Sequence, residues 1–230
     1  MRFGVVVFPG SNCEQDVLHA LHYLGFEADY IWHQDTELSG FDAVILPGGF
    51  SYGDYLRCGA VARFSPVMNA VIRYAEAGRP VLGICNGFQI LAEAHLLPGA
   101  LLRNRGLKFI CQNVPLRVEK SVCQWLELAP GTVVHMPINH NEGNFTCDKE
   151  TLKQLEDNGQ IVLRYCEPDG TRQPTGSAAN GALDDIAGIC NQRGNVFGLM
   201  PHPERATDGI SGERDGAAFF TAISQTLLAV

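Results

Sequence analysis

Apolar runs and amphipathic segments alternate along the first hundred residues of the chain. The runs 3–8, 27–32, 41–46 and 80–82 are short and largely apolar, which is typical of buried strands. Segments with apolar residues at helical spacing lie between several of these runs. Because alternating strands and helices pair as parallel strands with helices on both faces of the sheet, this pattern predicts an α/β fold.

Three helices are expected in this half of the chain. The first begins after Ser11, whose S-x-x-E pattern with Glu14 predicts a capping box, and it ends at Gly25. The second begins at Ser65-Pro66, an N-cap followed by a proline at the first helical position, and it ends near Gly78. A third helix directly follows the fourth strand.

The second half of the chain changes character, because some of its strands follow one another without a helix between them. The expected strands are 108–119, 132–137, 161–166, 186–190 and 195–200, and the expected helices are 149–157, capped by Asp148, and 216–229. A turn at 191–194 joins the last two strands, and the polar stretch 167–181 is expected to form a long surface loop. These hairpins predict an antiparallel portion added to a mostly parallel sheet.

Composition narrows the class of protein. The 230 residues are 46% hydrophobic and 18% charged, as expected of a single globular domain over 1–230 with a sizeable core. The net charge of −8 and the lack of a basic run argue against nucleic-acid binding. No apolar stretch approaches the ~20 residues that span a bilayer, and the apolar N-terminus is too short for a signal peptide. We therefore expect a cytoplasmic protein that does not enter membranes.

Eight cysteines are scattered through the chain without any C-x-x-C pair. A disulfide framework is not expected in a chain of this length without a targeting signal, and the missing ligand pairs argue against a zinc site. We therefore expect no metal. Most of the cysteines are interpreted as small buried hydrophobic residues.

Cys85 differs from the other cysteines because of its local sequence. It lies in Gly83-Ile84-Cys85-Asn86-Gly87, between a predicted strand and a predicted helix. This is the G-x-S-x-G layout of a nucleophile elbow with sulfur in place of the hydroxyl. The pattern predicts a nucleophilic thiol held at the tip of a sharp turn, at the end of a strand.

A thiol nucleophile needs a base, and the base needs a group that orients it. Of the seven histidines, only His202 directly follows a predicted strand within a proline-stiffened segment, Pro201-His202-Pro203-Glu204. Strand ends are where sites gather in open α/β sheets. Together with the elbow, this segment predicts a Cys85–His202–Glu204 triad.

The triad also needs backbone N–H groups that stabilise a developing oxyanion. One is expected from Asn86, the residue after the nucleophile. The second is expected from Gly48-Gly49 at the end of the neighbouring strand, because glycine permits unusual backbone angles and close approach to a ligand.

The order of these motifs resembles the class I (triad) glutamine amidotransferases. Most members of that family read G-x-C-x-G-H-Q at the elbow, whereas this chain has Phe88 before Gln89. The variant is similar to the branch that forms the glutaminase subunit of phosphoribosylformylglycinamidine (FGAM) synthase. The string 47–60, PGGFSYGDYLRCGA, and the segments 8–13, 107–111 and 200–205 agree with the same branch.

The resemblance implies a three-layer, flavodoxin-like fold over the whole chain and hydrolysis of L-glutamine to glutamate and ammonia. Cys85 would form a γ-glutamyl thioester, His202 would transfer protons and Glu204 would orient His202. The family pattern places Gln89 and the segment around Asn139, His140, Asn141 and Glu142 in the glutamine pocket. Family members often have glycine at the position of Asn141.

The resemblance also implies partners. Ammonia would pass to a separate synthetase subunit, assembled with a small bridging subunit, that converts formylglycinamide ribonucleotide (FGAR) to FGAM in purine biosynthesis. The chain contains no Walker A sequence and no G-x-G-x-x-G opening a helix after a strand. We therefore expect no cofactor in this chain, and ATP and magnesium at the synthetase.

Three alternatives share some of these features. Another class I amidotransferase would keep the triad and serve a different acceptor, although Asn86, Phe88 and the 47–60 string argue against it. A stand-alone Cys-His hydrolase, such as a peptidase, would be active without a partner. A binding module with a degenerate site would not need Cys85, His202 and Glu204 together.

Overall fold

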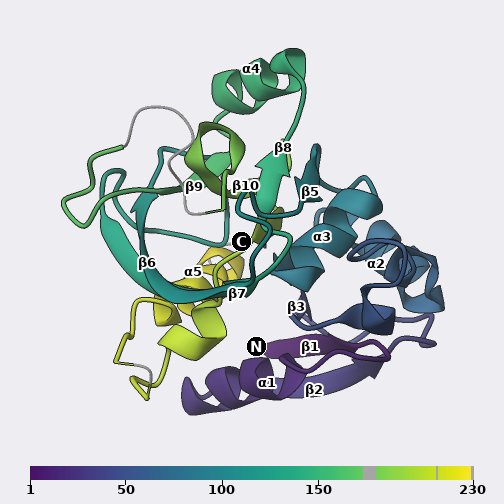
Figure 1. Ribbon diagram of the computed structural model, residues 1–230. Helices are drawn as coiled ribbons and strands as arrows, with labels where there is room; N and C mark the ends of the chain where they lie inside the picture. Colours follow the sequence, from purple (N-terminus) through teal and green to yellow (C-terminus); the bar gives the residue numbers. More distant parts are fainter. Residues whose placement is uncertain (173–179, 211, 229–230) are drawn as a thin grey trace.

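A nine-stranded sheet forms the centre of the computed structural model, which describes residues 1–172, 180–210 and 212–228 (Figure 1). Its strand order is β2-β1-β3-β4-β11-β10-β9-β6-β7. The five parallel strands are β1 (Arg2–Val7), β2 (Glu27–Trp32), β3 (Ala43–Leu46), β4 (Val81–Ile84) and β11 (Val196–Leu199). Since β3 and β4 are buried at every position and their connections contain helices, they pair as parallel strands, as the alternating pattern predicts.

The remaining strands extend the same sheet with antiparallel pairs. They are β6 (Ile110–Val118), β7 (Val133–His140), β9 (Ile161–Tyr165) and β10 (Ile186–Cys190). β10 and β11 form the expected hairpin through the turn 191–194, in which the Gly194 N–H donates to the Asn191 carbonyl. A separate two-stranded sheet of β5 (Ala100–Leu102) and β8 (Asn144–Thr146) was not predicted, because three-residue strands carry no recognisable alternation.

Helices cover both faces of the sheet, as expected. They are α1 (Glu14–Tyr23), α2 (Pro66–Glu76), α3 (Asn86–Glu93), α4 (Lys149–Asp157) and α5 (Ala217–Leu228). Successive residues of a strand point to opposite faces of the sheet, and two neighbours in β11 contact different helices. Phe197 stacks on Phe219 of α5, whereas a Cβ at Gly198 would lie 2.3 Å from Phe88 of α3. α5 and α3 therefore cover opposite faces. Among the described residues, no helix combines the length and hydropathy needed to cross a membrane.

Of the side-chain caps predicted for α4 and α1, the structure confirms the first and contradicts the second. Asp148 caps α4 as expected, because its Oδ1 accepts from the Thr151 N–H at 2.7 Å. The capping box at the start of α1 is wrong. Cys13 holds the N-cap position, and the Ser11 hydroxyl instead accepts from the Phe8 N–H because Ser11 pairs with Gly49.

The structure describes part of the predicted surface loop 167–181. The described part of the predicted loop 167–181 contains neither helix nor strand, and residues 173–179 lie outside the described residues.

β7 runs to His140, three residues beyond the predicted end at 137. This extension places Asn139 and His140 at the carboxyl end of a strand instead of in a turn.

Candidate active site

Cys85 lies at the sharp turn between β4 and α3, as the elbow pattern predicts. Its φ of 49° and ψ of −102° are a strained combination for a residue with a side chain. The Cys85 N–H donates to the Leu199 carbonyl of β11 at 2.8 Å, which holds the turn against the neighbouring strand. Backbone strain that the surrounding structure maintains is common at catalytic positions.

The small residues of the elbow are needed for packing. A Cβ at Gly87 would lie only 1.9 Å from the Leu46 carbonyl oxygen of β3, and a Cβ at Gly83 would lie 2.7 Å from the Gly87 backbone. The helix therefore approaches the sheet at a distance that only glycine allows.

We expect Gly87→Ala to destabilise the protein by at least about 3 kcal/mol, because the contact involves backbone atoms that cannot rotate away. Gly106→Ala is the matched control, since no atom lies within 4 Å of its added Cβ, and it should change stability by less than about 0.5 kcal/mol. Urea unfolding of both variants measures the difference. Equal stability of the two variants would contradict the close packing of the elbow.

His202 and Glu204 lie directly after β11 and form a buried pair. The His202 Nδ1 lies 2.6 Å from the Glu204 Oε1, and both side chains are almost completely buried. The His202 N–H donates to the Pro137 carbonyl of β7 at 2.8 Å, which fixes the segment against the sheet. This carboxylate can hold the imidazole with its Nε2 free to exchange a proton.

The electrostatic surroundings favour a charged imidazole. Burial by itself lowers the pKa of His202, but the Glu204 carboxylate, together with the neighbouring Cys85 and Cys13 side chains, outweighs burial and raises that pKa well above its ordinary value. The His202 Nε2 and the Glu204 Oε2 have no hydrogen-bond partner within the part of the chain that the structure describes. The three predicted triad residues are therefore brought together, with Cys85 close enough to act on the His202 charge.

Cys13 is a neighbour of the triad that sequence reasoning did not identify. Its sulfur, a His202 nitrogen and a Glu204 oxygen all lie within 4.8 Å of one another, so these groups could hold a metal ion. A second such group, His135, Glu213 and Asp215, is partly exposed. The expectation of no metal rested on spacing along the chain and remains a prediction. The only available signal for Cys13 was its place in the segment 8–13.

The Gly48-Gly49 peptide lies beside the triad. The Gly48 carbonyl accepts from the Cys13 N–H at 3.4 Å, and a Cβ at Gly48 would lie 2.8 Å from the His202 ring. Gly49 has a φ of 131°, and among the described residues its N–H has no hydrogen-bond acceptor. The two glycines thus permit both the close approach and a backbone donor that is free for a ligand.

A cavity of about 280 Å³ opens at Cys85. Six other predicted site residues line it, namely Gly49, Gln89, Asn139, His140, Asn141 and Glu142, together with four that were not predicted as site residues, Phe50, Asp54, Cys58 and Arg103. The Cys85 sulfur lies 3.8 Å from the Asn139 carbonyl oxygen. A ligand in this cavity can therefore reach the thiol.

Asn86 lies at the first position of α3, and its side chain ties the elbow to a neighbouring loop. Its Oδ1 accepts from the Ser51 N–H at 3.1 Å, and its Nδ2 donates to Asp54 at 3.2 Å and to Gln89 at 2.9 Å. The Gln89 Nε2 in turn donates to the Glu142 carbonyl at 2.6 Å. The Asn86 backbone N–H has no intrahelical partner at this position, as an oxyanion donor requires.

Asn104 fixes the segment that carries His140. Its Nδ2 donates to the carbonyls of Lys108 and His140, so its Oδ1 must accept from the Gly143 N–H and from the His140 Nδ1. The His140 proton is thereby placed on Nδ1, and the buried Nε2 is left as an acceptor. Sequence reasoning missed Asn104, because a single asparagine in a loop carries no motif.

Burial and the charge of His202 lower the pKa of His140 to about 4. The unfolded chain, with a histidine pKa of about 6.5, therefore binds more protons between these values, and stability falls as the pH falls through this range. Between pH 7 and pH 5, we expect His140→Gln to lose about 2 kcal/mol less stability than the unmodified chain. Urea unfolding at both pH values tests this, and His22→Gln, at an exposed position, controls for the loss of a histidine. Identical losses in all three proteins would contradict it.

Comparisons with known proteins agree with this geometry. Residues 1–217 match the CobB/CobQ-like glutamine amidotransferase domain. The chain is 57% identical to phosphoribosylformylglycinamidine synthase subunit PurQ of Thermomicrobium roseum, with 97% of this chain and 95% of that protein covered. It is 54% identical to the subunit of the same name from Acaryochloris marina, with 100% and 98% covered.

Solved structures share the fold. A chain in the structure of PurLQS from Thermotoga maritima is 43% identical and superposes with a TM-score of 0.86, with 98% of each chain covered. A glutamine amidotransferase from the same organism is 15% identical, with a TM-score of 0.58 and with 100% of this chain and 84% of that chain covered, and it supports the fold alone. With a family domain matched over most of its length and relatives above 50% identity over nearly all of it, the chain belongs to the glutamine amidotransferase family.

Proposed function

We propose that this chain is the glutaminase subunit of FGAM synthase, and that it hydrolyses L-glutamine to glutamate and ammonia. The observation that carries the proposal is the strained Cys85 elbow beside the buried His202–Glu204 pair, at the end of a cavity of amino-acid size. The relatives named PurQ support the assignment to FGAM synthase.

In the proposed reaction, the Cys85 thiolate attacks the side-chain carbonyl carbon of glutamine. The resulting tetrahedral intermediate collapses as its C–N bond breaks, and protonated His202 gives a proton to the leaving ammonia. Neutral His202 then removes a proton from water, which attacks the γ-glutamyl thioester and releases glutamate. Glu204 stabilises the cationic form of His202 during the first step.

The backbone N–H groups of Gly49 and Asn86 are assigned to the oxyanion. Both belong to residues around the cavity or its elbow, and neither has a backbone acceptor among the described residues. Gln89, Asn139, His140 and Asn141 are assigned to the glutamine pocket. Two donors that are already oriented stabilise the developing negative charge more strongly than water would, because they need not reorganise during the reaction.

The ammonia is used by a synthetase partner that converts FGAR to FGAM with ATP and magnesium, in a complex that also contains a small bridging subunit. This partnership is supported by the likeness to a chain of PurLQS from Thermotoga maritima. The chain itself would carry no cofactor, and it would act in the cytoplasm, where purine synthesis takes place.

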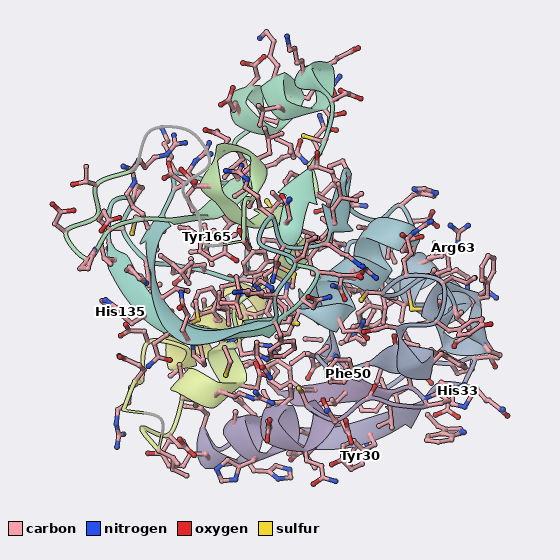
Figure 2. The ribbon with its side chains drawn as sticks, in the orientation of Figure 1. Tyr30, His33, Phe50, Arg63, His135 and Tyr165 are labelled. Carbon is pink, nitrogen blue, oxygen red and sulfur yellow. The ribbon has the colours of Figure 1, made fainter. Side chains whose placement is uncertain are left out.

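The surface around residues 50–64 fits a partner-binding role. Tyr55, Leu56 and Phe64 are 73%, 83% and 75% exposed, and Phe50 of the same loop lines the cavity. Figure 2 shows Phe50 and Arg63 on the side of the molecule that carries α2 and α3. The Arg57 guanidinium donates two hydrogen bonds to the Glu93 carboxylate, so Arg57 holds the segment against α3 of its own chain and is not free to bind a partner's carboxylate.

Replacing Tyr55 and Leu56 together with serine is expected to weaken binding to the synthetase about 10- to 100-fold, because exposed apolar anchors contribute most to such interfaces. Binding is measured by calorimetry or surface plasmon resonance. Tyr30→Ser is the matched control, since Tyr30 is 47% exposed on the edge strand β2. Unchanged affinity of the double variant would place the docking surface elsewhere.

The direct test of the proposed function is a glutaminase assay of the purified chain, alone and with the synthetase and bridging subunits. We expect glutamate release that increases in the complex. Robust hydrolysis of peptides or esters with none of glutamine would favour the stand-alone hydrolase.

A further inference from the structure

A second cavity reaches Glu204, and none of its described lining residues also lines the cavity at Cys85. Its volume is about 350 Å³, and α1 and the segment after β11 supply the lining: Asp16, His19, Glu204, Arg205, Asp208 and Ile210. Of these six side chains, three are carboxylates and one is a guanidinium. A cavity with this excess of acidic groups attracts cations. The proposed glutaminase reaction assigns it no role.

Cys13 places a sulfur beside His202 and Glu204. It holds the N-cap position of α1, and its sulfur, a His202 ring nitrogen and a Glu204 oxygen all lie within 4.8 Å of one another. These three residues are only 2%, 1% and 3% exposed. Arg205 fixes the sulfur, because its guanidinium donates to Cys13 at 3.3 Å and to Asp16 of α1 at 3.0 Å. A sulfur, a nitrogen and an oxygen that can each bind a metal are thus gathered at one buried place.

The two oxygens of the Glu204 carboxylate differ in their surroundings. Oε1 lies 2.6 Å from the His202 Nδ1, whereas Oε2 is buried and lacks a hydrogen-bond partner among the described residues. A buried carboxylate oxygen without a partner is unfavourable, and a cation beside it relieves that cost. Since Glu204 also lines the second cavity, this oxygen independently indicates a positively charged ligand.

We propose that Cys13, His202 and Glu204 bind one Zn²⁺ ion and that this ion inhibits the glutaminase; the inhibition, unlike the binding, rests on the proposed function. Thiolate, imidazole and carboxylate are ligands that zinc takes in proteins, at ~2.0–2.3 Å. Around a tetrahedral ion such atoms lie roughly 3.3–3.7 Å apart, which small side-chain rotations reach from the observed group. The thiolate and the carboxylate balance the two charges of the ion, and a thiolate ligand disfavours magnesium and calcium.

The spacing argument against zinc does not cover this group of ligands. That argument concerns pairs of ligands close together in the sequence, whereas Cys13 comes from the start of the chain and His202 and Glu204 come from its last thirty residues. The acidic second cavity supplies the entry path that a metal site needs.

Binding replaces protons with the metal. The Zn–S bond forms as the Cys13 S–H bond breaks, and the thiol proton passes to the solvent. His202 binds through a nitrogen lone pair, so its cationic form gives up one proton as well. The metal-bound imidazole no longer protonates ammonia, and Glu204 no longer stabilises the imidazole cation. Because no oxidation and no covalent bond between protein atoms is involved, a chelator should restore the activity.

The binding test uses Co²⁺, which takes the same ligands as zinc and shows a sulfur-to-metal charge-transfer band when a thiolate binds it. Absorption titrations of the full chain compare Cys13→Ala, Cys85→Ala and the matched control Cys111→Ala, which removes an exposed thiol. We expect one Co²⁺ per chain, displaced by Zn²⁺, with the band lost only in Cys13→Ala. A band that survives in Cys13→Ala, or one that is lost in Cys85→Ala, would place the metal elsewhere and overturn the site.

The inhibition test measures glutamate release by the complex with the synthetase and bridging subunits, and each rate is divided by the same variant's rate with a chelator. Saturating Zn²⁺ should lower the rate at least about 100-fold, since the triad loses its base. Cys13→Ala should need at least about 100-fold more zinc for half-inhibition, because even an outer-shell partner changes metal affinity by about 10- to 100-fold. Equal zinc sensitivity of Cys13→Ala and Cys111→Ala would overturn the inhibitory role.

Folding and the wider function are checked separately. Melting temperatures without metal show whether the variants are folded, and Cys13→Ser replaces Cys13→Ala if alanine prevents folding. Zn²⁺ should raise the melting temperature of the unmodified chain and of Cys111→Ala more than that of the Cys13 variant, because it binds the native state. An unmodified complex that releases no glutamate even with the chelator would overturn the proposed function, and the cobalt band would still decide the metal site.

Discussion

Cys85→Ala is expected to lower glutamine hydrolysis by about 10⁴-fold or more, to the background of the assay. The thioester cannot form without the sulfur, and His202 and the oxyanion donors then have no covalent intermediate to stabilise. Glutamate release from radiolabelled glutamine measures the loss. FGAM formation by the reconstituted complex should be lost with glutamine and retained with ammonium chloride, because the synthetase does not use the thiol.

The control for this variant is Cys111→Ala, which removes an exposed thiol at some distance along the chain from the elbow. It should retain both activities. Glutamine-dependent synthesis that survives in Cys85→Ala would contradict the covalent mechanism and revive the possibility of a binding module. Loss of the ammonia-dependent reaction would show that the substitution disturbs the complex and not only the chemistry.

Much of the fold could be predicted from local pattern. Strand β2 was predicted at the residues where it occurs, and Asp148 was predicted as the cap of α4, because both depend on interactions within a few residues. The capping box at Ser11 failed for the opposite reason. Ser11 pairs with Gly49, which lies 38 residues further along the chain, and this distant contact outweighs the local preference.

The same distinction between local motifs and distant contacts separates the site residues that could be predicted from those that could not. Cys85, His202 and Glu204 could be predicted because each lies in a short motif whose spacing reflects its chemistry. Asn104 and Asp54 could not, since their roles arise from contacts with His140 and Asn86 that only the folded sheet creates. Cys13 reaches His202 from the other end of the chain, and no spacing rule describes that approach.

Glu204→Gln is expected to lower kcat/KM for the substrate glutamine by about 10²- to 10⁴-fold. This loss is expected even though the new side chain at position 204 has nearly the same shape as the original carboxylate. The neutral amide cannot stabilise the His202 cation, which is almost completely buried and has this carboxylate 2.6 Å away. An amide that turns its NH₂ group toward Nδ1 would also favour the wrong tautomer of the imidazole. The variant should fold normally, because it leaves no cavity.

The pH profile distinguishes this electrostatic role from a structural one. Glu204 raises the pKa of His202, so its replacement lowers that pKa and disfavours the imidazolium that protonates the leaving ammonia. The alkaline limb of kcat/KM should therefore move to lower pH in Glu204→Gln, and it should stay in place in the surface control Glu150→Gln. An activity loss with an unmoved limb would mean that Glu204 only positions the ring. Full activity with an unmoved limb would remove Glu204 from the triad.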